Sequence, residues 1–573
     1  MRRHAALLIR NARQRIPGHS TTCLEDSHMS RPAIRFALTA ISTALLSACG
    51  GGGGGGATAT TSLSGTVADG YLKGAIVCLD VNTNGLCDSG EPTATTTDGG
   101  KYTLSGVTAG DETKYPVLVL VPDSAVDSDN PGSTVGKGYF LSSPAGKGGF
   151  VSPLTTLIQQ KVAAGATLEA AENSVKALLA INDSAVSLLN DYVAAQGNAV
   201  QTDATSAGRF ARAHEAAKVI AASLQAGYDT LKSDTSAKAV HKVLLAQAED
   251  ALTVQAATSA DTATPTFSTT GVIAADSANT LKARVAYEKY GSTAATQAVS
   301  IDFDVTAGGQ TVSCGATIAG LGTKGTSGQI RDLRFYIANV MLIDAQGNAV
   351  PLKLDDNANQ SRGVALVDFE DATGKCPTST GTAATYKTIT GKVAPGNYVG
   401  VEMTLGVPVR SADADRVALN HSDTTAATTP ALLGNSAMAW SWQSGRKFSK
   451  IEFVPDAPIV RPTGTTTAWN VHLGSTGCKG DPTKGVVTAC TNPNRMDFSF
   501  AAFNAGTQKV VLDLAELFKY SDLSYDGGGA AGCMSGTTDP ECAGIFQALQ
   551  IDLASGLPIN GGATQRVFVV KSK

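Results

Sequence analysis

The chain has few charged and aromatic residues, and several well-known functional signatures are missing from it. Charged residues make up 16% of its 573 positions, aromatic residues 6%, and the formal net charge is −4. Phosphate recognition needs clustered lysine and arginine, and no basic run occurs, so we expect no nucleic-acid partner. The sequence has no G-x-S-x-G, no H-E-x-x-H and no C-x-x-C, which argues against common hydrolase, zinc-ribbon and thioredoxin-like centres. We therefore expect a binding protein rather than an enzyme.

The only long apolar stretch near the N-terminus is typical of a lipoprotein signal, predicted over residues 29–48. It runs from Phe36 to Ala48, is too short to span a bilayer, and ends at the lipobox cysteine Cys49. Acylation of Cys49 would anchor the protein to a membrane without crossing it, and we expect an outer-membrane lipoprotein facing the periplasm or the cell surface. Residues 1–28 are interpreted as a mis-set translation start, and residues 49–61 as a Gly-rich tether.

Eight cysteines remain once Cys23, in the leader, and the lipidated Cys49 are set aside. An even number of cysteines in an exported protein predicts disulfides. Proximity in the sequence favours three pairs and elimination leaves the fourth: Cys78–Cys87, Cys478–Cys490, Cys533–Cys542 and Cys314–Cys376.

Residues 62–144 are predicted to form a small β-sandwich, because residues 95–104 are similar to the turn-and-strand signature of carboxypeptidase-regulatory-like modules. Such modules are usually spacers. A loop within it follows the EF-hand calcium pattern, although no helix is expected on either side. Two interpretations remain open, a structural calcium site and a polar turn closed by a disulfide. The loop residues in question are Asp80, Asn82, Asn84, Leu86, Asp88 and Glu91.

Residues 151–252 change to helical periodicity and predict a small Ala-rich bundle. Ser152, followed by proline, is a good helix N-cap. His214 and His241 lie on amphipathic helices, where a surface or core histidine is far commoner than a metal ligand. A Thr/Ala/Ser-rich stretch then indicates a linker, 253–286.

Residues 287–573 are predicted to be mostly β. Apolar residues alternate at 299–305, 399–405 and 498–500, and glycine, proline, asparagine and aspartate cluster between these segments. The expected fold class is therefore mainly β: a C-terminal antiparallel β-sandwich-like domain, a small N-terminal β-sandwich and a central Ala-rich helical segment.

This last region contains a series of spaced motifs. They are Asp332-Leu333-Arg334-Phe335-Tyr336, 364–370, Leu405-Gly406-Val407-Pro408, Asn420-His421, Trp440-Ser441-Trp442-Gln443, Trp469-Asn470-Val471-His472, Asn492-Pro493-Asn494-Arg495, 511–514 and Asp539-Pro540-Glu541-Cys542. Together they resemble the MbnP-like family, also called the metallo-mystery pair four-Cys family. The resemblance implies a secreted or periplasmic copper protein, partnered by a di-haem cytochrome c peroxidase-like protein that oxidises tryptophan to kynurenine. One departure is visible at Gly445-Arg446-Lys447, where the family pattern has Gly-Tyr-Lys.

His421 and His472 are the only histidines after residue 241, and the resemblance implies that both bind copper. Zinc normally requires three or four protein ligands, whereas two imidazoles with one weak further donor suit Cu(I). Asp423 could orient the second ring nitrogen of His421.

The chain has three tryptophans, and each could fill the core or supply a kynurenine as the third donor. Trp469 is nearest to His472 in sequence, but residues 469 and 472 of a regular strand point to opposite faces, so shared ligation needs a bulge between them. Trp440 and Trp442 are the alternatives. The function predicted is copper uptake or handling; the alternative is a structural or adhesive surface lipoprotein with a calcium-stabilised β-module.

Overall fold

The computed structural model describes most of the chain after the tether. The described residues are 59–199, 204–269, 277–379, 381–422, 429–440, 445–481 and 486–573. The predicted signal and the lipobox cysteine Cys49 lie outside them. Within the described ranges, no helix combines the length and apolar character needed to cross a membrane.

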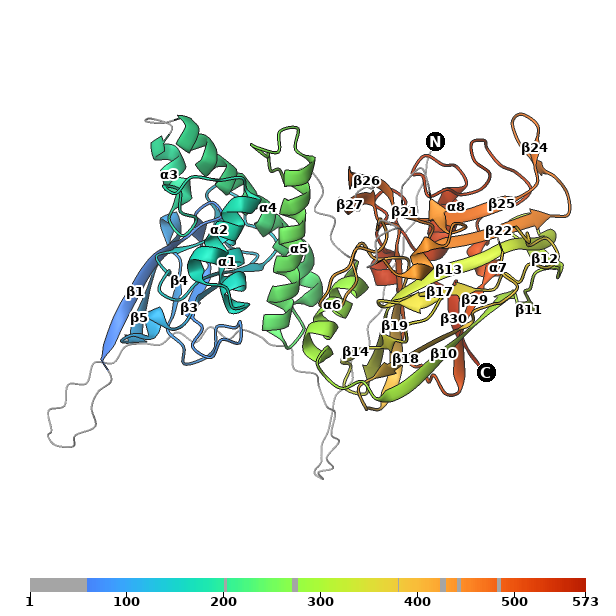
Figure 1. The fold of residues 1–573 in the computed structure, drawn as a ribbon, viewed down its shortest axis with the longest axis horizontal. Helices are drawn as coiled ribbons and strands as arrows, with labels where there is room; N and C mark the ends of the chain where they lie inside the picture. Colours follow the sequence, from blue (N-terminus) through green and yellow to red (C-terminus); the bar gives the residue numbers. More distant parts are fainter. Residues whose placement is uncertain are drawn as a thin grey trace, which may run out of the picture. The chain divides into compact units, whose positions relative to one another are not determined.

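The first β-region consists of two small sheets (Figure 1) and the short strand pair β2–β7. Alternating burial along β5, in which Tyr102 and Leu104 are buried, gives its sheet one apolar face. One sheet has the order β5-β1-β9, with β1 and β9 parallel, and the other has the order β4-β3-β6-β8 and is antiparallel. The strands are β1 (Thr60–Val67), β2 (Leu72–Lys73), β3 (Ile76–Leu79), β4 (Thr93–Thr95), β5 (Lys101–Thr108), β6 (Val117–Val121), β7 (Val126–Asp127), β8 (Tyr139–Ser143) and β9 (Phe150–Val151).

The first helix that follows begins where the sequence predicts. The Ser152 hydroxyl accepts a hydrogen bond from the backbone of Thr155 at 3.2 Å, and proline occupies the first helical position of α1. Leu154 and Leu157 join Val67 and Phe150 in one apolar core, so the β-region and the helices are packed as a single unit. The helices are α1 (Pro153–Ala163), α2 (Leu168–Leu178), α3 (Tyr192–Ala199), α4 (Ala204–Leu231) and α5 (Ala237–Thr258).

The predicted linker 253–286 contains regular structure at both ends. It includes the last turns of α5 and most of α6 (Ala278–Tyr290). Ser277 caps α6, and Ala283 and Ala286 pack against the buried Met341. Helix α6 is therefore attached to the β-domain that follows it.

The C-terminal region is built from two large sheets, as predicted. The smaller has the order β15-β18-β10-β29-β30, and in the larger the long strand β13 pairs with β12, β14, β17, β19 and β22. Nearly all pairs are antiparallel; β10 and β29 are the parallel exception. The main strands are β10 (Gln297–Ala307), β13 (Thr326–Asp344), β17 (Val364–Asp368), β18 (Thr388–Val393), β19 (Tyr398–Leu405), β22 (Ser449–Pro455), β25 (Trp469–Leu473), β28 (Met496–Phe500), β29 (Gln508–Asp513) and β30 (Phe568–Ser572).

Shorter strands and helices accompany these sheets. Two hairpins concern the site below, β20–β21 and β26–β27. The shorter elements are β11 (Gln310–Thr311), β12 (Ile318–Leu321), β14 (Ala349–Pro351), β15 (Lys353–Leu354), β16 (Gln360–Ser361), β20 (Ala439–Trp440), β21 (Gly445–Arg446), β23 (Ile459–Val460), β24 (Thr465–Thr466), β26 (Thr476–Asp481), β27 (Val486–Asn492), α7 (Leu514–Leu517) and α8 (Cys542–Leu549).

Aromatic side chains from both sheets fill the space between them. Phe335 of β13 contacts Phe303 and Phe568 edge-to-face, with ring centroids 6.1 and 5.7 Å apart, and Phe498 stacks on Phe568 at 4.6 Å. All four rings are at most 4% exposed. This shared core makes the region a sandwich.

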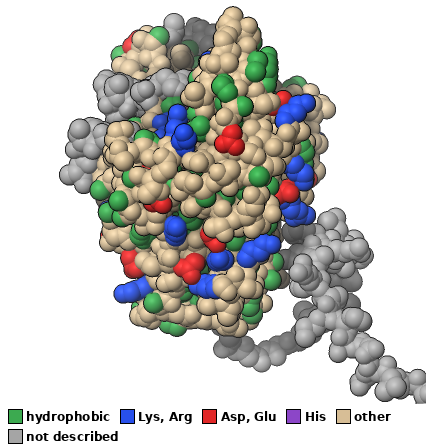
Figure 2. All heavy atoms as spheres, turned by 90° about the vertical axis from the view of Figure 1, so that its right-hand side faces the viewer, with side chains coloured by type: hydrophobic (Ala, Val, Ile, Leu, Met, Phe, Trp, Pro, Cys, Tyr) green, Lys and Arg blue, Asp and Glu red, His purple; other side chains and the backbone are tan. Residues whose placement is uncertain are grey.

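The four predicted disulfides are all present, namely Cys78–Cys87, Cys314–Cys376, Cys478–Cys490 and Cys533–Cys542. Charged side chains of both signs are scattered over the face seen in Figure 2, without a patch of one sign. The scattered charges on this face are consistent with the small share of charged residues in the sequence.

Candidate metal centre

His472 lies in β25 on the face opposite the core. Its strand neighbours Val471 and Leu473 are buried in the sandwich, while the His472 imidazole places Nε2 2.8 Å from Oε1 of Glu452. Burial lowers the pKa of His472 below its ordinary value, although Glu452 opposes this shift. A neutral imidazole is the form that binds metals.

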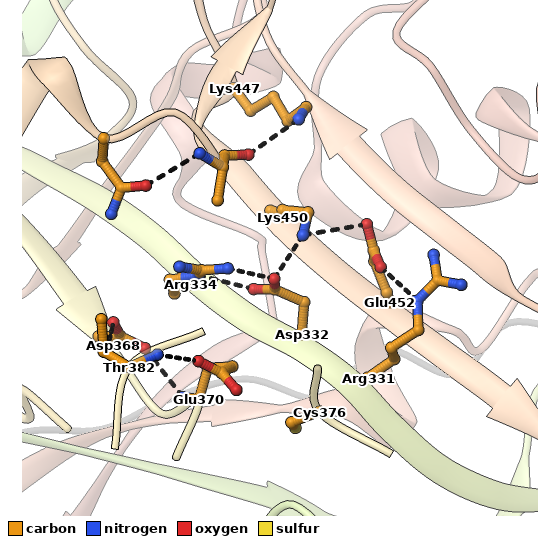
Figure 3. A network of polar contacts seen from close by, with 12 residues as sticks. Arg331, Asp332, Arg334, Asp368, Glu370, Cys376, Thr382, Lys447, Lys450 and Glu452 are labelled. Carbon is orange, nitrogen blue, oxygen red and sulfur yellow. Dashed lines mark hydrogen bonds and ion pairs between the residues drawn. The ribbon is translucent and has the colours of Figure 1, made fainter. Parts of the chain in front are cut away.

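Glu452 belongs to a buried network of charges that links β13 to β22 (Figure 3). Its Oε2 accepts from Nε of Arg331 at 2.6 Å, and its Oε1 lies 3.4 Å from Nζ of Lys450. Lys450 also pairs with Asp332, which accepts from Nε of Arg334 at 2.8 Å. The side chains of Asp332 and Arg334 are fully buried. Each charge therefore has a partner of opposite sign, which low-dielectric surroundings require.

The far end of the network carries a perturbed carboxylate. Asp368 accepts from the backbone of Glu370 at 2.9 Å and from the Thr382 hydroxyl at 3.2 Å. Burial raises the pKa of Asp368 to about 6, and the nearby charge of Arg334 only partly offsets it. The sequence motif Asp332-Leu333-Arg334 marks this network, but its spacing alone did not reveal the partners on β22.

His421 lies in a turn and is 2% exposed. A Cβ placed on Gly445 would lie 2.8 Å from Nε2 of His421. The imidazole therefore occupies the space that a larger residue at position 445 would need. Ligand atoms of His421, Cys478 and Cys490 lie within 4.8 Å of one another. The two sulfurs are joined in a disulfide, so they support the imidazole rather than act as ligands.

Arg446 holds the turn on both sides of His421. Its Nη1 donates to the carbonyl of Asn420 at 3.0 Å and its Nη2 to the carbonyl of Ser422 at 3.2 Å. Its Nε donates to the carbonyl of Leu433 at 2.7 Å. The side chain is buried, which lowers the pKa of Arg446, although an arginine stays charged at neutral pH.

Trp440 is the described tryptophan that contacts a residue close to each histidine. It pairs with Gly445, which faces His421, across the β20–β21 hairpin. Its ring lies against Gly474, two residues after His472 on the same face of the chain, and a Cβ on Gly474 would overlap this ring. Trp440 is 4% exposed.

Trp469 has a different environment. β25 pairs with β22 without a register shift, so no bulge brings residues 469 and 472 to one face. Trp469 packs edge-to-face on Phe518 at 5.8 Å, and its Nε1 donates to the carbonyl of Tyr525 at 3.3 Å. This geometry favours a core role for Trp469. Trp442 and Asp423 lie outside the described residues.

A second group, Cys314, Glu370 and Cys376, also brings three potential ligand atoms together. The cysteines form a disulfide, and the Glu370 oxygens accept backbone hydrogen bonds from Ala372 and Thr382 at 2.8 and 2.7 Å. These contacts describe a structural turn.

The calcium-type loop in the first β-region is closed by hydrogen bonds. Asp80 accepts from the backbone of Asn84 and Gly85, both at 3.0 Å. Glu91 accepts from the backbone of Val81 at 2.8 Å and of Asp88 at 3.0 Å, which joins the two ends of the loop. The oxygens lie on one compact loop, as both interpretations from the sequence require.

Comparisons with known proteins found matches to the C-terminal part of the chain. A family profile described as MbnP matches residues 296–535, which include both histidines. MbnP from Methylosinus trichosporium, a solved structure, is 39% identical; the alignment covers 48% of this chain and 98% of that chain, with a TM-score of 0.44. A search of curated proteins gave no match. On the strength of the sequence identity over nearly the whole of that relative, the chain belongs to the MbnP family.

Proposed function

We propose that this protein binds copper through the imidazoles of His421 and His472 and acts in copper uptake or handling. The observation that carries the proposal is that the only two histidines within residues 296–535 both lie close to residues that contact Trp440: His421 is buried against Gly445, and His472, whose side chain is 12% exposed, is two residues before Gly474. Burial favours the neutral imidazole of His472, and His421 is packed beside a glycine and a disulfide. A donor set of two nitrogens without carboxylate or thiolate ligands fits Cu(I) better than Zn²⁺ or Ca²⁺.

The contact with Glu452 also indicates which ring nitrogen of His472 would bind the metal. With Nε2 of His472 facing Glu452, that nitrogen carries the proton and Nδ1 keeps the free electron pair. Glu452 would thus act as the group that orients a copper ligand.

Trp440 is the proposed third donor after oxidation to kynurenine by a di-haem cytochrome c peroxidase-like partner. Its location between Gly445 and Gly474 supports this choice over Trp469, whose indole is engaged in the core. Coexpression with such a partner should add the mass and near-ultraviolet absorption of kynurenine to the peptide containing Trp440. A Trp440→Phe variant serves as the control and should remain unmodified.

The proposed location is the outer membrane, through acylation of Cys49. Mass spectrometry of the native N-terminus tests it. An unmodified cysteine, or a mature start elsewhere, would contradict it.

Calcium is proposed as a stabiliser of the β-module, because the oxygen-rich loop from Asp80 to Glu91 is already closed on itself. Adding millimolar calcium should raise the unfolding temperature of the protein, and Glu91→Gln should remove that response while leaving copper binding unchanged. A stronger dependence on calcium than on copper would favour the alternative role of a structural surface lipoprotein.

Copper binding is tested on the mature chain by titration with Cu(I) against a competing chelator. His421→Ala and His472→Ala should each weaken binding by at least about 100-fold, and the two effects should not be additive, since the loss of either imidazole leaves too few donors. His214→Ala, which removes a histidine from helix α4, is the matched control and should bind as the wild type does. If both site variants keep wild-type affinity, the two-histidine site is wrong.

A further inference from the structure

We propose that Arg446 is a positioning residue for His421 and that its fixed positive charge makes the copper site favour Cu(I) over Cu(II). The inference rests on the proposed function. It concerns Arg446, which follows Gly445 in the hairpin beside His421.

The first step is geometric. The guanidinium donates to the carbonyls of Asn420 and Ser422, the residues immediately before and after His421, at 3.0 and 3.2 Å. The backbone nitrogen of Arg446 donates in turn to the Asn420 side chain at 3.1 Å. The planar fork of an arginine fixes several acceptors at once, so the two peptide groups that carry His421 cannot rotate independently. Such preorganisation reduces the conformational entropy lost when a metal binds.

The second step concerns charge. The partners of the Arg446 guanidinium are neutral oxygens of Asn420, Ser422 and Leu433, and no described carboxylate pairs with it. Other arginines of the same domain, such as Arg331, are paired with acids.

A buried cation that no described carboxylate pairs with is costly, and it also disfavours a second positive charge placed nearby. The proposed site lies next to this cation, because Gly445, the residue before Arg446, contacts His421.

The carboxylate beside the other histidine does not cancel this effect. Glu452 is already neutralised by Arg331 and Lys450, whose nitrogens lie 2.6 and 3.4 Å from its oxygens. Lys447, whose Nζ donates to the carbonyl of Ala437 at 2.9 Å, adds a further cation on the same hairpin. Arg446 and Lys447, the described cations of this hairpin, therefore favour the metal state with the lower charge.

Two variants separate positioning from charge. Arg446→Lys keeps the positive charge but loses the fork, whereas Arg446→Met loses both. The mature chain is titrated with Cu(I) against a competing chelator, and the Cu(II)/Cu(I) potential is measured by redox titration. We expect both variants to bind Cu(I) at least about tenfold more weakly. Arg446→Met should also lower the potential by about 59 mV for each tenfold change in the ratio of the two affinities, and Arg446→Lys should leave the potential close to that of the wild type.

The controls make the outcomes decisive. Arg461→Met removes an arginine that pairs with Asp526, and it should change neither quantity. Arg446→Tyr introduces the family residue and should behave as Arg446→Met in the redox titration. Because loss of a buried arginine can unfold a loop, near-ultraviolet circular dichroism is recorded for each variant, and Arg446→Lys provides the folded comparison.

This inference would be overturned, and the proposed function left standing, if Arg446→Met kept the wild-type potential and Cu(I) affinity while His421→Ala bound copper more weakly. Wild-type copper affinity in His421→Ala would overturn the proposed function and this inference with it. Wild-type Cu(I) affinity in Arg446→Lys would overturn the positioning role, because the lysine lacks the planar fork. An unchanged potential in Arg446→Met would overturn the charge role.

Discussion

The two histidines of the candidate site are held by opposite means. His472 projects from a regular strand, and a carboxylate within a network of paired charges fixes its Nε2. His421 lies in a turn whose flanking carbonyls are fixed by an arginine, with a disulfide beside its ring. One half of the site is thus stabilised by side-chain electrostatics and the other by backbone hydrogen bonds and covalent bonds. Substitutions in the charge network should therefore mainly affect His472, and substitutions in the turn or loss of the disulfide should mainly affect His421.

The largest effect is expected from Asp332→Ala. This substitution leaves Arg334 and Lys450 buried without their shared carboxylate, which should lower the free energy of unfolding by about 3–5 kcal/mol. Urea unfolding measures it, with the exposed Asp356→Ala as control. Magnetic resonance should show a larger shift for the His472 ring than for His421. Equal shifts would mean that the two halves are coupled.

Removing disulfides should separate stability from copper binding. The Cys314–Cys376 bridge spans 62 residues and Cys478–Cys490 spans 12, so the chain-entropy estimate gives losses of about 4 and about 3 kcal/mol for double Cys→Ala variants. Copper affinity should follow the reverse order, because Cys478–Cys490 lies beside His421. Chelator competition on the two variants checks this. A greater loss of copper in the variant lacking Cys314–Cys376 would contradict the local role of the shorter bridge.

The charged half should also respond to pH through Asp368. Its native pKa of about 6 lies above the ordinary value of about 3.9, so the folded protein binds the extra proton between these values. This group therefore makes the free energy of unfolding fall as pH rises from 4 to 6, by about 3 kcal/mol at most. Asp368→Asn should remove that contribution, seen as the difference between wild-type and variant unfolding at pH 4 and 6.5. A constant difference would show that Asp368 titrates normally.

The smallest effect is expected from Gly445→Ala. The added methyl group would lie 2.8 Å from Nε2 of His421 and displace the ring, which should cost about 1–3 kcal/mol and weaken copper binding. Gly434→Ala is the matched control, since a Cβ there meets no atom within 4 Å. Thermal unfolding and chelator competition measure both variants. Unchanged copper affinity in Gly445→Ala would place the metal away from this side of the imidazole.

Much of the fold could be predicted because its signals are local. Alternating apolar residues located strands such as β10 and β19, and Ser152 with the following proline located the start of α1. Sequence proximity sufficed for three disulfides, and elimination for the fourth.

The arrangement of the site could not be predicted in the same way, because it depends on strand register. His472 faces Glu452 only because β22 and β25 pair with Lys450 opposite His472, and no pattern in either strand reveals this alignment. The role of Arg446 was visible only as a departure from a family motif. Proximity in sequence favoured Trp469 as the neighbour of His472, whereas the regular register of β25 directs its indole into the core.

Because the first β-region and the helices share one core, a gene segment that encodes only one of them would encode an incomplete core. Leu154 and Leu157 of α1 complete the apolar packing around Val67 and Phe150. A recombination event between residues 144 and 151 would give each descendant half of a core, with apolar side chains exposed in both. The β-module and its helices must therefore be inherited together, and α6 is shared at the junction, since its Leu281 and Val285 belong to the first core whereas its Ala283 and Ala286 pack against Met341 of the C-terminal domain.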